Sequence, residues 1–295
     1  MASEPSPRAA LSTHLILLAG QLCFAALAVA GRMAVAHIPP GAIPFVRSTG
    51  AALVFGAIAW RRGTLRLARG DLGLVVLCAL LGTVINQEMF IHGLARTTVT
   101  NTVVLGATVP VFTALFAIVL GKEPARARRL AGMAIAFGGV AALLGAERLT
   151  TSSQYLAGSA MVLVNCVSYG AFLVIGKPLA ERYDPVALLA MMFAIAVVFV
   201  APLGIYDLAT SPALTASDCW FLAFLIAVPT IAGYTLVQLA LRRAESSLVA
   251  AYIYLQPLLA AIGAVLLLDE RIGPRTVACS AIVLFGVWLA ARSRP

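Results

Sequence analysis

The chain has 295 residues, of which 61% are hydrophobic and 11% are charged, whereas soluble globular domains are about 45–50% apolar and about 25% charged. This composition excludes an ordinary soluble domain and indicates a protein whose solvent is lipid. The formal net charge is +9, but the basic residues form short clusters between apolar runs, which favours membrane orientation over a nucleic-acid partner. The five cysteines are dispersed singly and predict no disulfide framework, metal site or cofactor.

Ten apolar segments are long enough to cross a bilayer, for which a helix needs about 20 residues. In chain order they cover residues 13–36, 42–60, 71–93, 99–121, 126–145, 155–177, 185–207, 216–239, 246–268 and 273–292. The first segment has the apolar core of a signal peptide, but its leader is not clearly basic, because Glu4 offsets Arg8. We therefore keep it as a span and predict an all-α membrane protein with ten transmembrane helices.

Lys and Arg residues are divided unevenly between the two sets of connections. With a cytoplasmic N-terminus, 15 of the 21 fall on the cytoplasmic side. The outer side keeps Arg32, Arg47, Arg96, Arg148, Arg271 and Arg275. Because cytoplasmic connections are enriched in Lys and Arg, the sequence predicts a multi-pass protein of the bacterial inner membrane with both termini in the cytoplasm.

The sequence also contains an internal repeat, since a shift of 145 residues aligns the start of each half, 31–40 with 176–185, and a shift of 147 residues aligns the later segments. The polar and proline matches in register are Arg96 with Arg243, Pro110 with Pro257 and Glu123 with Glu270. Each half, 1–148 and 149–295, then holds five spans. Because five is an odd number, the second half must enter the membrane from the opposite side. Such inverted repeats are typical of transporters with a central substrate cavity between the halves.

Two segments carry a family resemblance, namely TVPVFTALFAIVLGKEP (108–124) and YLQPLLAAIGAVLLLDERI (254–272). In each, a proline precedes an apolar run that ends at an acidic residue. With its two five-helix halves, the whole chain resembles the drug/metabolite transporter superfamily, EamA type, although Lys122-Glu123-Pro124 departs from the usual Glu-Arg. Among bacterial members it is most similar to the YddG-like aromatic amino-acid exporters. The resemblance implies a secondary transporter that exports small metabolites, with amino acids, aromatic ones included, as the expected class, and implies no enzyme.

A polar cluster interrupts the third span at Asn86, Gln87, Glu88 and His92. A charged group at the centre of a span costs about 2.5–3.5 kcal/mol on insertion scales, so it usually faces the bundle interior or a watery cavity. Helical spacing places Glu88 and His92 on one face. Two interpretations stay open: a cavity wall that binds substrate or carries a proton, and a cluster near the outer end of the span that headgroups hydrate.

Other polar residues recur at helical spacing in the first, sixth, eighth and ninth spans. The candidate substrate-binding residues are Gln21, Asn86, Glu88, His92, Asn165, Tyr169, Tyr234, Gln238, Tyr252 and Gln256. Tyrosines are also common at membrane interfaces, which is the alternative for each of them. Aromatic rings beside amides favour an amphipathic organic solute over an inorganic ion. We expect these residues to line a cavity between spans one, three, six, eight and nine.

Pro110 and Pro257 occupy equivalent positions inside spans four and nine. A proline frees one carbonyl and bends a helix, so the pair is predicted either to act as hinges for alternating access or to be fixed kinks. Residues 170–178, GAFLVIGKP, lack the spacing of a phosphate loop. The alternatives to this exporter are a proton-coupled carrier of another metabolite that uses Glu88 and a multispan enzyme acting on a lipid-linked substrate.

Overall fold

The computed structural model describes residues 7–122, 124, 127–150, 153–269 and 273–291. Its α-helices are α1 (Pro7–Ala34), α2 (Ala42–Arg61), α3 (Leu72–Ala79), α4 (Ile85–Leu94), α5 (Val99–Gly106), α6 (Val109–Val119), α7 (Ala127–Thr150), α8 (Ser153–Ile175), α9 (Lys177–Arg182), α10 (Pro185–Thr210), α11 (Ala216–Leu225), α12 (Tyr234–Arg243), α13 (Ser246–Ala251), α14 (Leu255–Leu268) and α15 (Pro274–Ala291). Short 3₁₀ turns, η1 (Arg69–Asp71) and η4 (Tyr252–Tyr254), and two π-helical segments, η2 (Leu80–Val84) and η3 (Ile226–Gly233), complete the helical elements of these residues.

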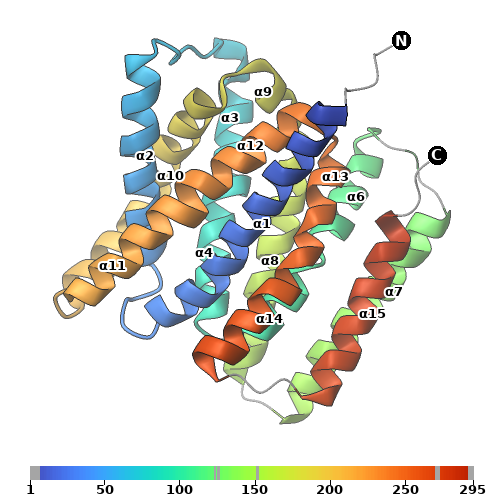
Figure 1. Ribbon diagram of the computed structural model, residues 1–295. Coiled ribbons are helices and arrows are strands. Elements are labelled where there is room, and N and C mark those ends of the chain that lie inside the picture. Colours follow the sequence, from blue (N-terminus) through green and yellow to red (C-terminus); the bar gives the residue numbers. More distant parts are fainter. Residues whose placement is uncertain (1–6, 123, 125–126, 151–152, 270–272, 292–295) are drawn as a thin grey trace.

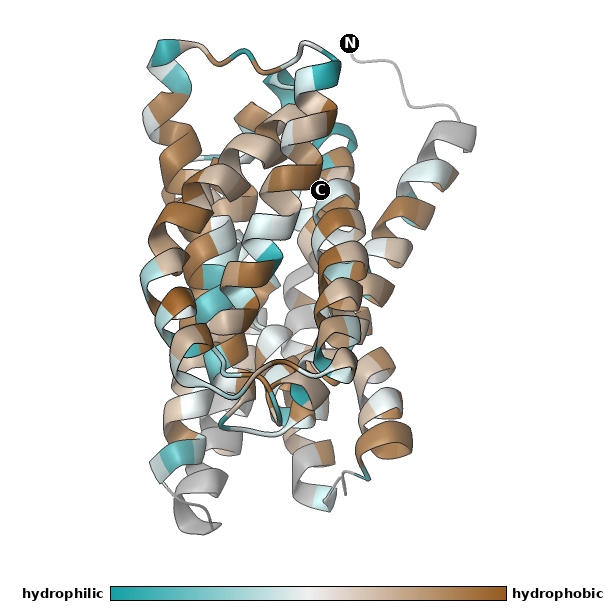
Figure 2. Ribbon diagram, turned by 90° about the vertical axis from the view of Figure 1, so that its left-hand side faces the viewer, coloured by the Kyte–Doolittle hydropathy of each residue, from teal (hydrophilic) through white to brown (hydrophobic). Residues whose placement is uncertain are grey.

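The protein is an all-helical, multispan membrane protein (Figure 1). In the described ranges, seven helical stretches are long and apolar enough to cross a membrane: Leu11–Ala34, Ala42–Arg61, Arg69–Leu94, Val99–Val119, Ser153–Ile175, Pro185–Thr210 and Ala216–Arg243. Helices also occupy the other three predicted spans, as α7, α13–α14 and α15. Hydrophilic residues gather at the ends of the bundle and in a smaller group at mid-height (Figure 2). Membrane insertion explains why large apolar side chains such as Leu53 and Val198 are about 70% exposed.

One end of the bundle, which we call the first end, contains the start of α1. His14 of α1 hydrogen-bonds to Tyr252 of η4. η4 directly follows the short helix α13, and α13 follows the end of α12, so the end of α12 is also near this end. Lys177, which follows α8, donates from Nζ to the backbone carbonyl of Leu241 in α12 at 3.2 Å. Arg182 binds Asp71, before α3, at 2.7 Å. The start of α1 and the end of α8 therefore lie at the same end of the molecule.

The opposite end, which we call the second end, contains the end of α1 and the start of α8. Arg32 of α1 donates from Nη1 to the carbonyl of Leu94, the last residue of α4, at 2.9 Å. Just beyond α4, Arg96 lies against Gly158 in the first turns of α8, where a Cβ on the glycine would be 2.8 Å from the Cβ of Arg96. α1 therefore runs from the first end to the second, and α8 runs in the opposite direction.

The packing repeats when the two halves are exchanged. α2 packs along its equivalent, α10, and α7 packs along its equivalent, α15. α1 of the first half packs on α12 and α14 of the second. In the same way α8, the equivalent of α1, packs on α4 and α6 of the first half. In the α7–α15 pair, a Cβ on Gly286 would lie 2.4 Å from the backbone nitrogen of Ala136, and a Cβ on Gly139 would lie 2.9 Å from that of Val283. These four residues are two pairs related by the 147-residue shift. Small residues at such crossings let helix backbones approach closely in membranes.

Equivalent spans also carry equivalent interruptions. The π-helical segments η2 and η3 occupy the third and eighth spans, and the 147-residue shift maps 80–84 onto 227–231. The fourth span breaks between α5 and α6, and the ninth contains η4. Pro110 lies in the first turn of α6, where the missing N–H is not needed for the helix, so it begins a helix rather than bending one. Pro257 falls within α14, and its side chain lies outside the described residues.

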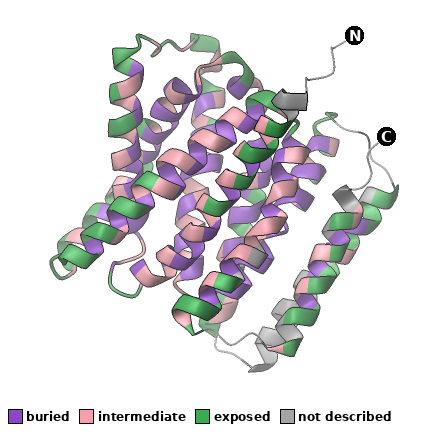
Figure 3. Ribbon diagram, viewed as in Figure 1, coloured by how far each residue is buried: buried purple, intermediate pink, exposed green. Residues whose placement is uncertain are grey.

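Buried residues concentrate in the centre of the bundle around α4 and α8, whereas α11 and α15 expose many residues (Figure 3). Side chains of the second half contact the π-helical segment η2 of the first half. Ser168 donates to the carbonyl of Leu81 at 2.6 Å, and the Tyr234 hydroxyl donates to the carbonyl of Gly82 at 3.1 Å. Because π-helical segments leave backbone carbonyls without their usual partners, these bonds stabilise an irregular segment in the interior and bring polar groups of both halves together.

Candidate functional site

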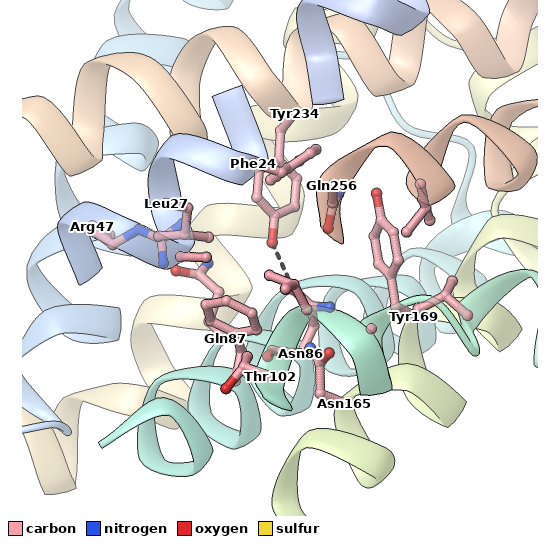
Figure 4. Close-up of a pocket in the computed structure, with 16 residues that line it drawn as sticks. Phe24, Leu27, Arg47, Asn86, Gln87, Thr102, Asn165, Tyr169, Tyr234 and Gln256 are labelled. Carbon is pink, nitrogen blue, oxygen red and sulfur yellow. Dashed lines mark hydrogen bonds between the residues drawn. The ribbon is translucent and has the colours of Figure 1, made fainter. Parts of the chain in front are cut away.

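A cavity of about 60 Å³ lies where these interrupted spans meet (Figure 4). Its polar lining residues are Arg47, Asn86, Gln87, Thr102, Asn165, Tyr169, Tyr234 and Gln256. Most of the other lining residues are apolar, and Phe24, Leu27 and Phe90 are the largest of them. Both halves contribute, through α1, α2, α4, α5 and α6 from the first and α8, α12, η4 and α14 from the second. Apolar walls with a few convergent polar groups are typical of sites for small organic ligands.

Asn86 is the centre of a hydrogen-bond network that joins the two halves. Its side-chain Oδ1 lies 3.1 Å from the Tyr234 hydroxyl and shares the single proton of that hydroxyl with the carbonyl of Gly82, and its backbone carbonyl accepts a bond from Asn165 Nδ2 at 2.8 Å. The Tyr234 ring packs edge-on against Phe193 and Phe24, with ring centroids 5.1 and 5.9 Å apart. These contacts fix the positions of an amide and a phenol at the wall of the cavity.

Half of the ten predicted binding residues line this cavity. They are Asn86, Asn165, Tyr169, Tyr234 and Gln256. Gln21 lies directly behind Gln256 and accepts a bond from its Nε2 at 2.7 Å, so it orients that amide from α1. Tyr252 is closer to the first end, where it contacts His14. Gln238 is buried, and its Nε2 lies 4.0 Å from the sulfur of Met192.

Glu88 and His92 do share a face of α4, but they do not belong to the cavity lining. Glu88 Oε2 lies 3.2 Å from His92 Nε2, and Arg96 donates to the backbone carbonyl of His92 at 2.8 Å. Successive residues of a helix are about 100° apart, so a cavity that contacts Asn86 and Gln87 leaves Glu88 turned away from it. The three groups form a polar row that runs along α4 toward the second end.

The structure corrects the prediction that Arg47 belongs to the outer connections. Arg47 lies inside α2, is only 1% exposed and lines the cavity. Its Nε donates to Thr230 Oγ1 of η3 at 2.9 Å, while Nη1 and Nη2 have no hydrogen-bond partner among the described residues. Counting charges by side treats any arginine near a span end as a connector residue. The signal that it was more than that is its position five residues inside a predicted span.

Gln87 and Thr102 are two further lining residues that the sequence reasoning did not select as binding residues. The repeat offered a signal for Gln87, because the 147-residue shift places it on Tyr234, a selected residue. The cavity is also lined from spans two and four as well as from the five predicted spans. Within the part of the chain that the structure describes, no cluster of three or more His, Cys, Asp or Glu side chains is placed to hold a metal ion.

A multispan helical bundle with a polar cavity between its halves is typical of membrane transporters. The model of the EamA-like transporter family matches the chain twice, at residues 11–145 and 156–292, and the chain belongs to this family. That assignment confirms the family-level resemblance and sets aside the alternative of a multispan enzyme. The double match agrees with a duplicated chain.

Relatives extend this assignment. The chain is 28% identical to an uncharacterised transporter of Archaeoglobus fulgidus over 94% of its own length and 96% of that protein. It is also 28% identical to a probable terminal-alkyne amino-acid exporter of Streptantibioticus cattleyicolor, over 84% of the chain and 81% of the relative. A solved crystal structure with 19% identity superposes with a TM-score of 0.70 and covers 96% of the chain, which shows a shared fold.

Proposed function

We propose that the protein is a secondary transporter that exports small amphipathic metabolites, with amino acids, aromatic ones included, as the main class. The observation that carries the proposal is the cavity shared by both halves, in which amides and phenols stand among large apolar side chains. This lining suits a solute with a polar and an apolar part better than an inorganic ion. The relative named a probable terminal-alkyne amino-acid exporter supports the same solute class and the direction of transport.

We further propose that ten spans form two inverted five-helix repeats, residues 1–148 and 149–295, that alternate access to the cavity. Support comes from the opposite directions of α1 and α8 and from the exchange of packing partners between halves. The interruptions η2, η3 and η4 and the break before Pro110 lie beside the cavity. They are the places where the backbone can bend when one half rocks against the other.

The first end is proposed to face the cytoplasm of a bacterium, with both termini on that side of the inner membrane. Basic residues at or near this end include Arg61, Arg62, Lys177, Arg182, Arg242 and Arg243. Their excess is the positive-inside pattern. A reporter enzyme fused after residue 295 should be active only in the cytoplasm, and activity on the outer side would contradict ten spans.

Counterflow in reconstituted vesicles tests the transport proposal. Vesicles loaded with one unlabelled amino acid should take up the same labelled solute without nucleotide, and a screen of all the amino acids and some nucleobases identifies the substrates. A cavity-filling variant is Gly106→Leu, because Gly106 lines the cavity and a Cβ there meets nothing within 4 Å. It should abolish counterflow.

The matched control is Gly138→Leu, at an exposed glycine of α7 whose Cβ position is equally open. It should transport as the wild type does. Counterflow that survives in both variants would show that the substrate does not use this cavity. No counterflow of any solute in the screen would overturn the proposed substrate class.

A further inference from the structure

We propose that Arg47 and Gln87 form a carboxylate-binding end of the cavity, so that the transported solutes must carry a carboxylate close to an apolar group. The inference rests on the proposed function, because it names the chemical requirement for substrates of the same cavity. It also assigns a role to the arginine that the structure places at the interior of the bundle.

Arg47 carries a charge where a membrane protein does not tolerate one without a reason. An arginine inside a membrane span is costly to insert, and buried charges are normally paired. The Thr230 hydroxyl is neutral and contacts Nε alone, at 2.9 Å. Nη1 and Nη2 are buried without a partner in the described residues. Because each of these nitrogens carries two N–H groups, four strong donors are unused.

Gln87 adds an amide with an unused donor and an unused acceptor on the same side of the cavity as Arg47. Figure 4 shows Arg47 and Gln87 on one side and Asn165, Tyr169 and Gln256 on the other. Gln87 is 2% exposed, and neither its Nε2 nor its Oε1 has a hydrogen-bond partner among the residues described. Nε2 is therefore a further donor for an anion, and Oε1 is a free acceptor for a neighbouring ammonium.

The positive charge at the cavity favours binding of an anionic group. Arg47 is the only charged residue among the described residues that line it. The nearest acidic group along α4, Glu88, is turned toward His92 instead. A carboxylate fits the planar fork of a guanidinium with two parallel bonds, and charge-assisted bonds are about twice as strong as neutral ones. The binding of a carboxylate would thus neutralise the buried charge.

The remaining lining completes the recognition of an amino acid. Phe24, Leu27 and Phe90 provide apolar walls for a side chain. An α-amino acid carries its ammonium one carbon away from its carboxylate, so a single amide such as that of Gln87 can donate to one and accept from the other. Solutes that lack the carboxylate, such as the corresponding amides and amines, leave the guanidinium unpaired.

Competition in counterflow measures this requirement. Labelled L-phenylalanine and L-leucine are each competed with the unlabelled acid and with its carboxamide, for the wild type and for Arg47→Gln. In the wild type we expect the carboxamide to compete at least about tenfold more weakly, a ratio that corresponds to about 1.4 kcal/mol, since it cannot make the charge-assisted bonds. In Arg47→Gln the two affinities should approach each other, mainly because the acid binds more weakly.

Two further variants test whether the preference for the acid depends on the position and on the shape of the charged group. Arg62→Gln removes an exposed arginine directly after α2 and should keep the wild-type preference. Arg47→Lys keeps the charge but loses the planar fork, so it should keep part of the preference. Equal competition by acid and carboxamide in the wild type would overturn the inference and leave the transport proposal intact.

A binding measurement separates the two proposals and does not depend on transport. The melting temperature of the detergent-purified protein is recorded with phenylacetate and with phenylacetamide. Phenylacetate alone should stabilise the wild type, and this stabilisation should be lost in Gln87→Leu as well as in Arg47→Gln. That result would support the carboxylate site even if no amino acid were exchanged. Equal stabilisation by both compounds, or by phenylacetate in every variant, would overturn it.

Discussion

The two halves of the molecule share their framework but differ in the groups that they present to the cavity. The π-helical segments η2 and η3 occur at equivalent positions, and Gly139 and Gly286 pack reciprocally. At the cavity, by contrast, Gln87 of the first half corresponds to Tyr234 of the second. The Tyr234 hydroxyl is fully engaged within the protein, whereas the Gln87 amide has no partner in the described residues.

This difference separates two kinds of constraint. A helix crossing depends on backbone distance, so both copies of the repeat need a glycine at the same position. A solute with one charged and one apolar end has no two-fold symmetry, so a cavity that fits it must differ between the halves. Arg47 shows the same difference, because neither shift gives it a charged counterpart: the 145-residue shift gives Met192 and the 147-residue shift gives Ala194. In the proposed mechanism, the shared framework therefore serves the movement of the halves, and the differences at the cavity serve recognition of the solute.

The largest effect is expected where the shared framework is broken. Gly286→Ala places a Cβ 2.4 Å from the backbone nitrogen of Ala136, so α7 and α15 must separate. Overpacking of this kind costs about 1–3 kcal/mol, and the melting temperature in detergent should fall by several degrees. Gly286→Val should leave little folded protein in size-exclusion chromatography.

The control for this variant is Gly138→Ala, one residue from Gly139 on the exposed side of α7. A Cβ there meets nothing within 4 Å, and alanine is the better helix former by about 1 kcal/mol. Its melting temperature should stay the same or rise. If Gly139→Ala were harmless while Gly286→Ala was not, the reciprocal packing of the two copies would be wrong.

A smaller effect is expected where the network between the halves is weakened. Tyr234→Phe keeps the ring against Phe193 and Phe24 but leaves Asn86 Oδ1 and the carbonyl of Gly82 without their donor. An unsatisfied buried acceptor costs about 1–3 kcal/mol, so counterflow should fall about tenfold at low substrate concentration. Tyr206→Phe, on an exposed tyrosine of α10, should behave as the wild type, and equal rates in both variants would place Tyr234 outside the transport path.

The sequence predicted the framework better than the site, for physical reasons. Hydropathy marks the spans, and the alignment of Gly139 with Gly286 was visible in the repeat. The π-helical segments were not predicted, because they depend on hydrogen-bond register and carry no composition of their own. Near Asn86 the pattern left open whether the polar groups face a cavity or the headgroups, and it did not show which of them face inward. A rotation of about 100° per residue decides that Gln87 lines the cavity and Glu88 does not.

The smallest effect is expected at Glu88, the acidic residue that has no counterpart in the second half, where Thr235 takes its place. Its carboxylate lies 3.2 Å from His92 and outside the lining of the cavity. Glu88→Gln keeps the shape of the side chain and removes its titration. We expect counterflow and proton-driven accumulation to change together and by less than about twofold, a ratio that corresponds to roughly 0.4 kcal/mol. His92→Gln, which removes the partner instead, should give the same result. If accumulation collapsed in Glu88→Gln while counterflow stayed intact, Glu88 would be a proton carrier, since exchange requires no net proton movement, and the asymmetry between the halves would then serve energy coupling as well as recognition.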